Sequence, residues 1–205
     1  ASGASVAWLQ QNILKAESSV EELSNQATEV SPGSEGLIFL PYMMGERSPI
    51  WHTNARGVFF GLSLTTTPAM MFRAVLEGTA FALAHNVEIA KKSGIRIDEI
   101  RSIGGGSKSG LWNQIKADVL GMPIAILQDS VGAAVGDAYL AGMGSGLFKD
   151  IRSTLKESVK IESRFQPNNK VHTYYQERYA SFRSLYESVK DEFDKSATTA
   201  TYKVN

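Results

Sequence analysis

The chain has 205 residues, of which 43% are hydrophobic and 20% are charged, as is ordinary for a globular domain. Lys plus Arg equal Asp plus Glu at 21 each, so no global field draws the chain to nucleic acid or to a membrane surface. The absence of cysteine excludes disulfides, zinc–cysteine sites and thiol nucleophiles, and it fits a cytoplasmic location. The sequence shows no signal peptide and no apolar run of the roughly 18–20 residues that span a bilayer. We therefore expect a cytoplasmic protein without nucleic-acid or membrane partners.

Short helices and short strands are predicted for the first third of the chain. Val6, Leu9 and Ile13 recur at helical spacing. Ser31-Pro32-Gly33 is a strong chain break, and two short apolar runs follow it. The expected elements are helices over residues 4–15 and 20–27 and strands over 36–40 and 57–62, with a loop rich in Gly, Pro and charge over 41–56.

A long helix, and then strands alternating with helices, are predicted for the remainder. Thr67 is a suitable N-cap, and Pro68 fits the first turn, where its missing N–H costs little. Apolar residues then recur at intervals of three and four as far as Gly94, which suits the end of a helix. The further expected elements are strands over 100–103 and 124–127, helices over 111–120 and 131–142, and an aromatic-striped helix over about 175–193. The alternation indicates one α/β domain over residues 1–195, its sheet covered on both faces, followed by a frayed tail over 196–205.

A glycine-rich turn is expected between the strand over 100–103 and the helix that follows it. Its sequence is Gly104-Gly105-Gly106-Ser107-Lys108-Ser109. Glycines let backbone N–H groups approach a ligand, and a helix N-terminus favours an anion, so the turn suits a nucleotide phosphate. A P-loop would need Gly at 102 and 107, and a dinucleotide fingerprint would need Gly at 109, but all three positions are Ser. Taken alone, the glycine run is equally compatible with an ordinary turn.

The residues around the turn carry a resemblance. Residues 104–124 closely resemble the adenosine-binding segment of FGGY-family carbohydrate kinases. Residues 57–62 with 70–77 resemble that family's second signature, although Met70 stands where the family usually has a polar residue. The segments over 3–8, over 41–57, with its Gly-Glu-Arg-Ser-Pro loop, and over 131–141 are similar to further family segments in the same order. The resemblance runs from about residue 2 to about residue 193.

The resemblance implies an actin-like ATPase (ribonuclease H-like) fold, with a mixed sheet, and a nucleotide site at the glycine turn. Gly105 matches the glycine near the phosphates, with Gly104 and Gly106 beside it, and Ser109 matches a polar residue that contacts the nucleotide. A side chain at Gly105 would block the approach of the ligand, and we also expect a positive φ there. Gly3 and Ala7 match two more nucleotide contacts, with plain helix packing as the other interpretation. Ala7 departs from the Gln of glycerol kinases, which puts a side-chain hydrogen bond there in doubt.

The resemblance also implies what this chain lacks. The family's catalytic Asp and its Asp-x-Gly-Thr phosphate loop lie upstream of the matching segments, so we assign no catalytic residue and no metal ligand here. ATP and Mg²⁺ are the implied cofactors, and a missing N-terminal kinase domain is the implied partner. Glu46 and Arg47 belong either to the cleft or to a solvated turn. His52, His85 and His172 have no metal-ligand spacing and are expected to be structural.

The implied reaction is transfer of the ATP γ-phosphoryl group to a sugar hydroxyl. The signature segments look most like those of xylulose kinases, whereas the Gly-Glu-Arg-Ser-Pro loop is equally similar to that of gluconate kinases. A non-catalytic actin-like nucleotide-binding module is the alternative from another class. We expect this chain alone to be inactive. We also expect Gly3–Leu9 and Tyr42–Trp51 to expose a surface that supports a homodimer.

Overall fold

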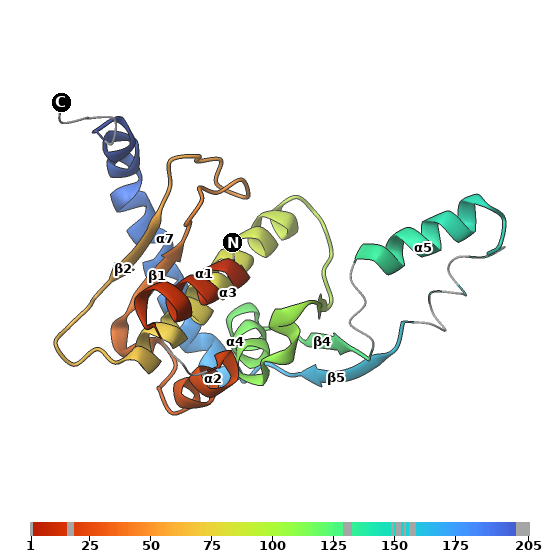
Figure 1. The fold of residues 1–205 in the computed structure, drawn as a ribbon, viewed down its shortest axis with the longest axis horizontal. Helices are drawn as coiled ribbons and strands as arrows, with labels where there is room; N and C mark the ends of the chain where they lie inside the picture. The colour runs from red at the N-terminus through yellow and green to blue at the C-terminus, as the bar shows by residue number, and fades with distance from the viewer. Residues whose placement is uncertain are drawn as a thin grey trace.

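The fold is given by a computed structural model that describes residues 2–15, 19–128, 133–148, 150, 153, 155 and 159–199. Its helices are α1 (Ser2–Trp8), α2 (Val20–Thr28), α3 (Pro68–Lys92), α4 (Gly110–Leu120), α5 (Ala133–Gly144) and α7 (Asn169–Thr199). Its strands are β1 (Ile38–Pro41), β2 (Gly57–Phe60), β3 (Ile100–Ser102), β4 (Ile124–Leu127) and β5 (Ile161–Phe165). Short helical turns are η1 (Leu9–Ile13), which is a π-helix, and the 3-10 turns η2 (Ser34–Gly36) and η3 (Gly105–Lys108). The α/β alternation expected from the sequence is therefore present (Figure 1).

The long helix α3 begins and ends as its sequence predicts. Thr67 Oγ1 accepts a hydrogen bond from the backbone N–H of Met70 at 3.3 Å, and Pro68 occupies the first turn. The C-cap is Ser93, and Gly94 follows it with a φ of +82°, a conformation that glycine adopts at no steric cost. At the other end of the chain, α7 continues to Thr199, four residues beyond the expected domain boundary, and residues 200–205 lie outside the described residues.

The strands of the described residues form two separate sheets and not one. β1 pairs antiparallel with β2, whereas β4 lies between β3, to which it is parallel, and β5, to which it is antiparallel. The second sheet is thus mixed, as expected. β5 is missing from the sequence prediction because only its end residues, Ile161 and Phe165, are apolar. It becomes a strand by pairing with β4.

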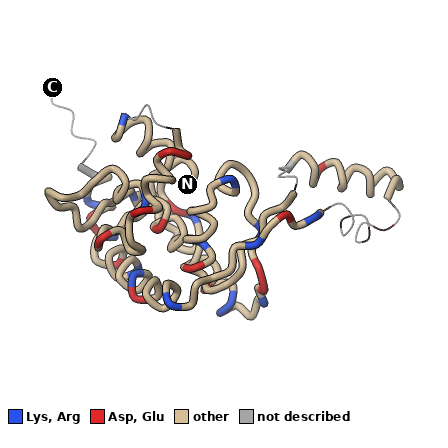
Figure 2. Tube along the Cα trace, turned by 90° about the horizontal axis from the view of Figure 1, so that it is seen from below, with Lys and Arg blue, Asp and Glu red and all other residues tan. Residues whose placement is uncertain are grey.

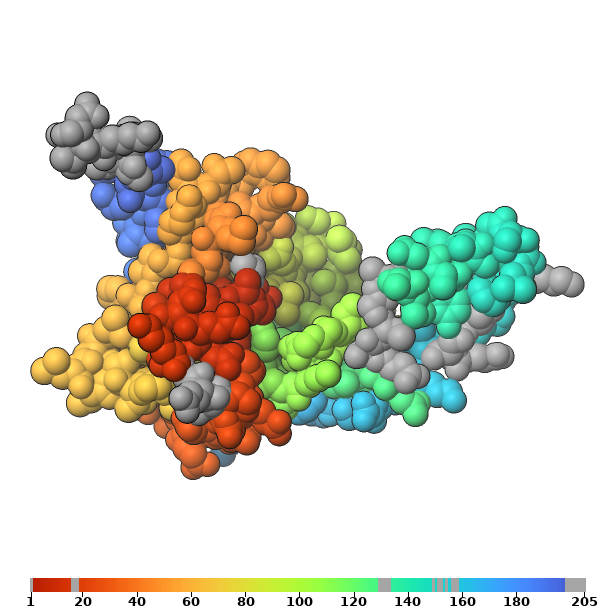
Figure 3. Space-filling model, in the orientation of Figure 1, coloured from red at the N-terminus to blue at the C-terminus, as the bar shows by residue number. Residues whose placement is uncertain are grey.

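The main core lies where α3 and α7 pack around the fully buried strand β1. Phe72 and Leu76 of α3, Phe39 of β1 and Phe182 of α7 are all buried in it. A smaller core, with Ile124 and Ala117 at its centre, fills the space beneath the mixed sheet. α5 projects away from the body on the side of β4 and β5 (Figures 1 and 3). None of the described helices is both long and apolar enough to cross a membrane.

The expected exposed surface over 3–9 and 42–51 is only partly present, which corrects the prediction. Val6, Leu9 and Tyr42 are at most 4% exposed, because helical spacing and the turn after β1 direct them into the main core. Met44 and Trp51 are 83% and 80% exposed, as expected. Charges of both signs are interspersed along the body of the chain (Figure 2).

Candidate functional site

The glycine turn joins β3 to α4 and is held by its own hydrogen bonds. Ser107 Oγ donates to the carbonyl of Gly104 at 2.7 Å. The side-chain amide of Asn113, which is fully buried on α4, donates to the carbonyl of Ser107 at 2.7 Å. Ser109 caps α4, because its Oγ accepts from the backbone N–H of Trp112 at 3.2 Å. The turn is therefore a fixed structure at the N-terminus of a helix.

The three glycines of the turn differ in what restricts a side chain at each position. Gly104 has a φ of +76° and a ψ of −166°, a conformation almost reserved for glycine. A Cβ on Gly106 would lie 3.0 Å from the Trp112 ring, a tight contact that disfavours a side chain there. A Cβ on Gly105 would meet no atom of the described chain within 4 Å, apart from its chain neighbours. The positive φ expected at Gly105 belongs instead to Gly104, because the chain reverses one residue earlier. Gly105 thus has no steric reason of its own to be glycine.

A hollow of about 470 Å³ lies between α2 and the turn, and we name it the α2 hollow. It brings together Gly105 and Ser109, two of the residues singled out from the sequence. The Oγ atoms of Ser109 and Ser24 are 3.0 Å apart and share a hydrogen bond, which links the turn to α2. Polar groups therefore line much of the wall. The lining residues are Val20, Glu21, Ser24, Asn25, Thr28, Gly105, Lys108, Ser109, Gly110 and Leu111.

A second hollow, of about 360 Å³, lies on the side of the turn that faces α1, and we name it the α1 hollow. It brings Gly3 together with Gly105 and Gly106. Gly3, like Gly105, has no atom of the described chain near the position of a Cβ. Ala7 is half-buried and is not among the residues that line either hollow. The lining residues are Ser2, Gly3, Thr79, Leu83, Ile103, Gly105, Gly106, Trp112 and Lys116.

A third hollow, of about 230 Å³, continues from the α1 hollow, with which it shares Ser2, Thr79 and Leu83. Glu46, Ser48 and Asn86 line its far side, so we name it the loop hollow. Glu46 Oε1 accepts from the backbone N–H groups of Arg47 and Ser48 at 2.9 and 3.3 Å. Glu46 therefore both stabilises its own turn and faces a hollow, whereas Arg47 is exposed.

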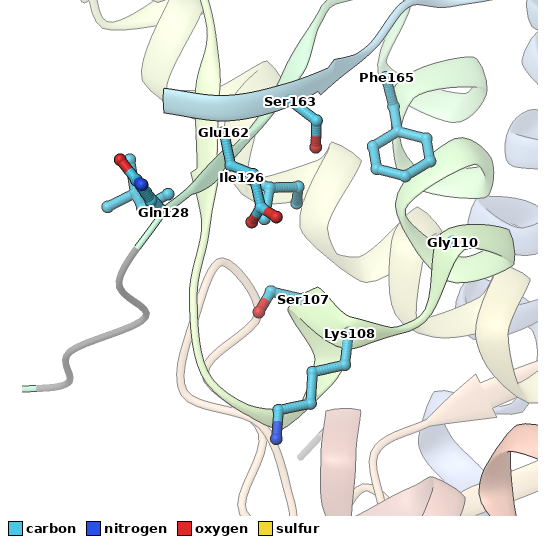
Figure 4. A pocket seen from close by; sticks show the side chains of 9 residues that line it. Ser107, Lys108, Gly110, Ile126, Gln128, Glu162, Ser163 and Phe165 are labelled. Carbon is cyan, nitrogen blue, oxygen red and sulfur yellow. The ribbon is translucent and has the colours of Figure 1, made fainter. Parts of the chain in front are cut away.

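A further hollow, of about 390 Å³, lies between the turn and the mixed sheet (Figure 4). Ser107 and Glu162 point into the same space, and Lys108 extends away from the strands. Its lining includes charges of both signs, those of the exposed Glu162 and Lys108, so it is less suited to an anion than a wall without a carboxylate. The α1 hollow has no carboxylate among its lining residues, which include Lys116.

Two of the three histidines have hydrogen-bond partners within the fold, whereas the buried Nδ1 of His85 has none among the described residues. His52 Nδ1 lies 2.8 Å from the hydroxyl of Tyr186, and His172 Nδ1 lies 2.8 Å from the carbonyl of Asp118. His85 is buried, and burial lowers its pKa. Among the described residues, no three His, Asp or Glu side chains come together as they would to hold a metal ion.

A strand–turn–helix unit of this kind, with open space over a glycine, is typical of α/β domains that bind anionic ligands. The sequence matches the model of the FGGY family of carbohydrate kinases, C-terminal domain, over residues 1–145. The xylulose kinase of Staphylococcus epidermidis is 38% identical over 190 residues, which are 93% of this chain and 38% of that protein.

Two solved structures give the same answer for the fold. The ligand-bound xylulose kinase of Lactobacillus acidophilus matches with a TM-score of 0.84 and 29% identity, over 94% of this chain and 39% of that one. The gluconate kinase of the same organism matches with the same values. The chain therefore belongs to the FGGY family of carbohydrate kinases, and its α/β fold is that of an actin-like ATPase. It spans 38% of the length of the xylulose kinases of Staphylococcus epidermidis and Bacillus subtilis.

Proposed function

We propose that this chain is the nucleotide-binding part of an ATP-dependent sugar kinase, and that Gly105 lies where the phosphates of the nucleotide pass. The observation that carries the proposal is the open space over Gly105 and over Gly3, both of which face the α1 hollow. At both positions a ligand could approach the backbone closely, because no side chain stands in the way.

The different polar groups of the two hollows beside Gly105 suggest which end of the nucleotide would lie in each. The α2 hollow offers hydroxyl and amide groups, such as those of Ser24 and Asn25, which suit a ribose and a base. The α1 hollow offers backbone and a cation, which suit phosphates. Since both hollows share Gly105, the nucleoside would lie over α2 and the phosphates would run past Gly105 toward Gly3. The loop hollow, with Glu46 and Ser48, then lies beyond the last phosphate.

In such a kinase the reaction is transfer of the γ-phosphoryl group to a sugar hydroxyl, and catalysis comes mainly from positioning and electrostatics. Mg²⁺, when bound, neutralises phosphate charge. The described residues offer no cluster of acidic side chains to hold it, so we assign it no ligand in this chain. The part played by this chain is to bind and orient the nucleotide and to keep water from one side of its phosphates. We assign it no catalytic base. We expect a domain that this chain does not include to bind the acceptor sugar and to supply the base.

A ketopentose such as xylulose is the substrate that we propose. Its support is the resemblance in sequence to proteins named xylulose kinase, which match over more than nine-tenths of the chain in Staphylococcus epidermidis and Bacillus subtilis. Gluconate is the second candidate, because the gluconate kinase structure is as similar in fold as the xylulose kinase structure. A non-catalytic nucleotide-binding module would use the same site without any sugar.

Calorimetric titration of the 205-residue chain with ADP tests the nucleotide site. Gly105→Val places a branched side chain in the open space, and we expect it to weaken ADP binding about tenfold or more while the melting temperature stays within about 2 °C. Gly136→Val is the matched control, because a Cβ at Gly136 of α5 also meets open space. It should leave ADP binding unchanged. Wild-type affinity in Gly105→Val, or loss of binding only through unfolding, would remove the support for the site.

A further inference from the structure

Lys116 of α4 is a half-buried lysine whose hydrogen bonds are to neutral groups. Its ammonium lies 3.2 Å from Asn113 Oδ1 and 3.3 Å from Ser102 Oγ, and it sits 4.6 Å from the centre of the Trp112 ring. No carboxylate of the described chain forms an ion pair with it at 4.0 Å or less. Burial lowers its pKa to about 8. At neutral pH the chain therefore holds a positive charge that is partly removed from water and has no anion beside it.

Removing an unpaired charge from water costs free energy. Ionisable groups with perturbed pKa values cluster at functional sites. Lys116 lines the α1 hollow together with Gly3, Gly105 and Gly106. Gly3 and Gly105 leave space for a ligand to approach the backbone, and the positive charge of Lys116 would attract an anionic ligand there.

Lys116 is also connected to the glycine turn through one fully buried side chain. Asn113 receives a hydrogen bond from Lys116 on its Oδ1 and donates from its Nδ2 to the carbonyl of Ser107. Because the amide of Asn113 is held at both ends, the position of the ammonium is fixed relative to the turn. A ligand that lies over Gly105 therefore meets a charge that is already in place, with little loss of side-chain entropy on binding.

We propose that the ammonium of Lys116 contacts the phosphate chain of the nucleotide in the α1 hollow. This inference rests on the proposed function, since it assigns a residue to the phosphates that pass Gly105. The other occupant to consider is a carboxylate from a part of the kinase that this chain does not span. The wall of the α1 hollow favours the phosphate, because its glycines leave room for a ligand next to the lysine.

Calorimetric titration with ADP and with adenosine tests the assignment on the 205-residue chain. Lys116→Met keeps the apolar stem and removes the charge, and we expect it to weaken ADP binding about tenfold or more, since a hydrogen bond to a charged group is lost. Adenosine, which has no phosphate, should bind Lys116→Met within about twofold of wild type. Lys116→Arg, which keeps a positive charge, should recover part of the ADP affinity. Lys170→Met is the matched control, because Lys170 is exposed at the start of α7.

The outcomes separate this inference from the proposed function. If wild type binds neither ADP nor adenosine, the nucleotide site itself is wrong, and the inference fails with it. If wild type binds ADP but Lys116→Met binds it equally well, or loses ADP and adenosine alike, then only the role of Lys116 is overturned. The melting temperature shows whether each variant stays folded, because Lys116→Met leaves the buried Oδ1 of Asn113 without its donor and is expected to lower the melting temperature somewhat whatever binds in the hollow. If Lys116→Met does not fold, Lys116→Gln, which keeps a polar group near Asn113, takes its place in the same comparison.

Discussion

Arg73 and Glu77, one turn apart on α3, form a buried ion pair in which Nε and Oε1 are 2.8 Å apart. The same carboxylate accepts hydrogen bonds from the backbone N–H of Gly33 at 2.9 Å, from Ser34 Oγ at 2.9 Å and from the hydroxyl of Tyr175 at 2.7 Å. It thus ties α3 to α7 and to the turn that follows α2. This pair lies in the segment over residues 70–77, which resembles a family signature, and its observed contacts are structural. By fixing the chain after α2, it helps to hold the wall of the α2 hollow.

Removing one partner of this pair should destabilise the fold strongly. In Glu77→Leu the charge of Arg73 stays buried without its carboxylate, and Gly33 and Tyr175 lose their acceptor. We expect a loss of about 3–5 kcal/mol in the free energy of unfolding, measured by urea denaturation. The double variant Arg73→Met with Glu77→Leu should lose less than the single variant, because no unpaired charge remains. A double variant that is less stable than the single one would contradict this account.

Gly78 of α3 is required by the close approach of β1. A Cβ at this position would overlap the backbone carbonyl oxygen of Phe39, which cannot move aside without disturbing the buried strand. We expect Gly78→Ala to lower the free energy of unfolding by about 1–3 kcal/mol, the usual cost of overpacking a core. Gly136→Ala on α5, where a Cβ meets open space, should instead be neutral or stabilising by up to about 1 kcal/mol. Equal effects of the two substitutions in urea denaturation would show that the contact with Phe39 is unimportant.

Glu88 should make stability depend on acid pH. Hydrogen bonds from Lys92 and Tyr179 lower its pKa to about 2 from an ordinary value of 4.5, and Arg183 lies 3.0 Å away. Since the folded state has the lower pKa, the stabilisation is fully present above about pH 4.5 and is lost as the pH falls toward 2. Glu88→Gln should therefore be less stable than wild type at pH 7, and the two should converge near pH 2.

Urea midpoints at pH 7, 4 and 2 measure this convergence. Glu187→Gln, which breaks the exposed pair with Lys190 on α7, is the control and should change stability by less than about 1 kcal/mol. A constant difference between Glu88→Gln and wild type at all three pH values would mean that ionisation of Glu88 does not stabilise the fold.

The sequence allowed much of the fold to be predicted because most elements carry local signals. The N-cap Thr67, the periodic apolar residues after it and Gly94 were enough for α3. β5 could not be predicted, since its pairing with β4 is a contact between distant parts of the chain that its own residues do not encode. The separation of the strands into two sheets was missed for the same reason.

At the site, the sequence pointed to the glycine turn but not to all that surrounds it. Gly105, Ser109 and Gly3 were singled out, and they line the α1 and α2 hollows. Lys116 was missed, because one lysine in a helix with charges of both signs looks like a solvated residue. Only the coordinates reveal that it is half-buried and that its ammonium lies over the Trp112 ring. The steric reasons that distinguish Gly104, Gly105 and Gly106 likewise depend on coordinates.

The chain alone should have negligible sugar kinase activity. It contains no residue that matches the family's catalytic Asp, and it spans 38% of the length of its relatives. A coupled assay with ATP, Mg²⁺ and a panel of pentuloses, hexuloses and gluconate measures this directly. Turnover of about 1 s⁻¹ or faster, within the usual range of kinases, would contradict the prediction.

The exposed side chains of Met44 and Trp51 should let the isolated chain self-associate at high concentration. Both lie in the loop between β1 and β2, and both are at least 80% exposed. Large exposed apolar patches often mark interfaces between proteins. Symmetric dimers are the commonest closed assembly, so we expect a mass near twice 22.3 kDa in light scattering across a concentration series. Trp51→Glu should restore the monomer, because association would bury a charge without a partner. Leu64→Glu is the matched control: Leu64 is also fully exposed but lies in the loop after β2, so its change should leave the dimer intact. A particle of strictly 22 kDa at every concentration would rule the dimer out, and dissociation by both variants would place the interface elsewhere.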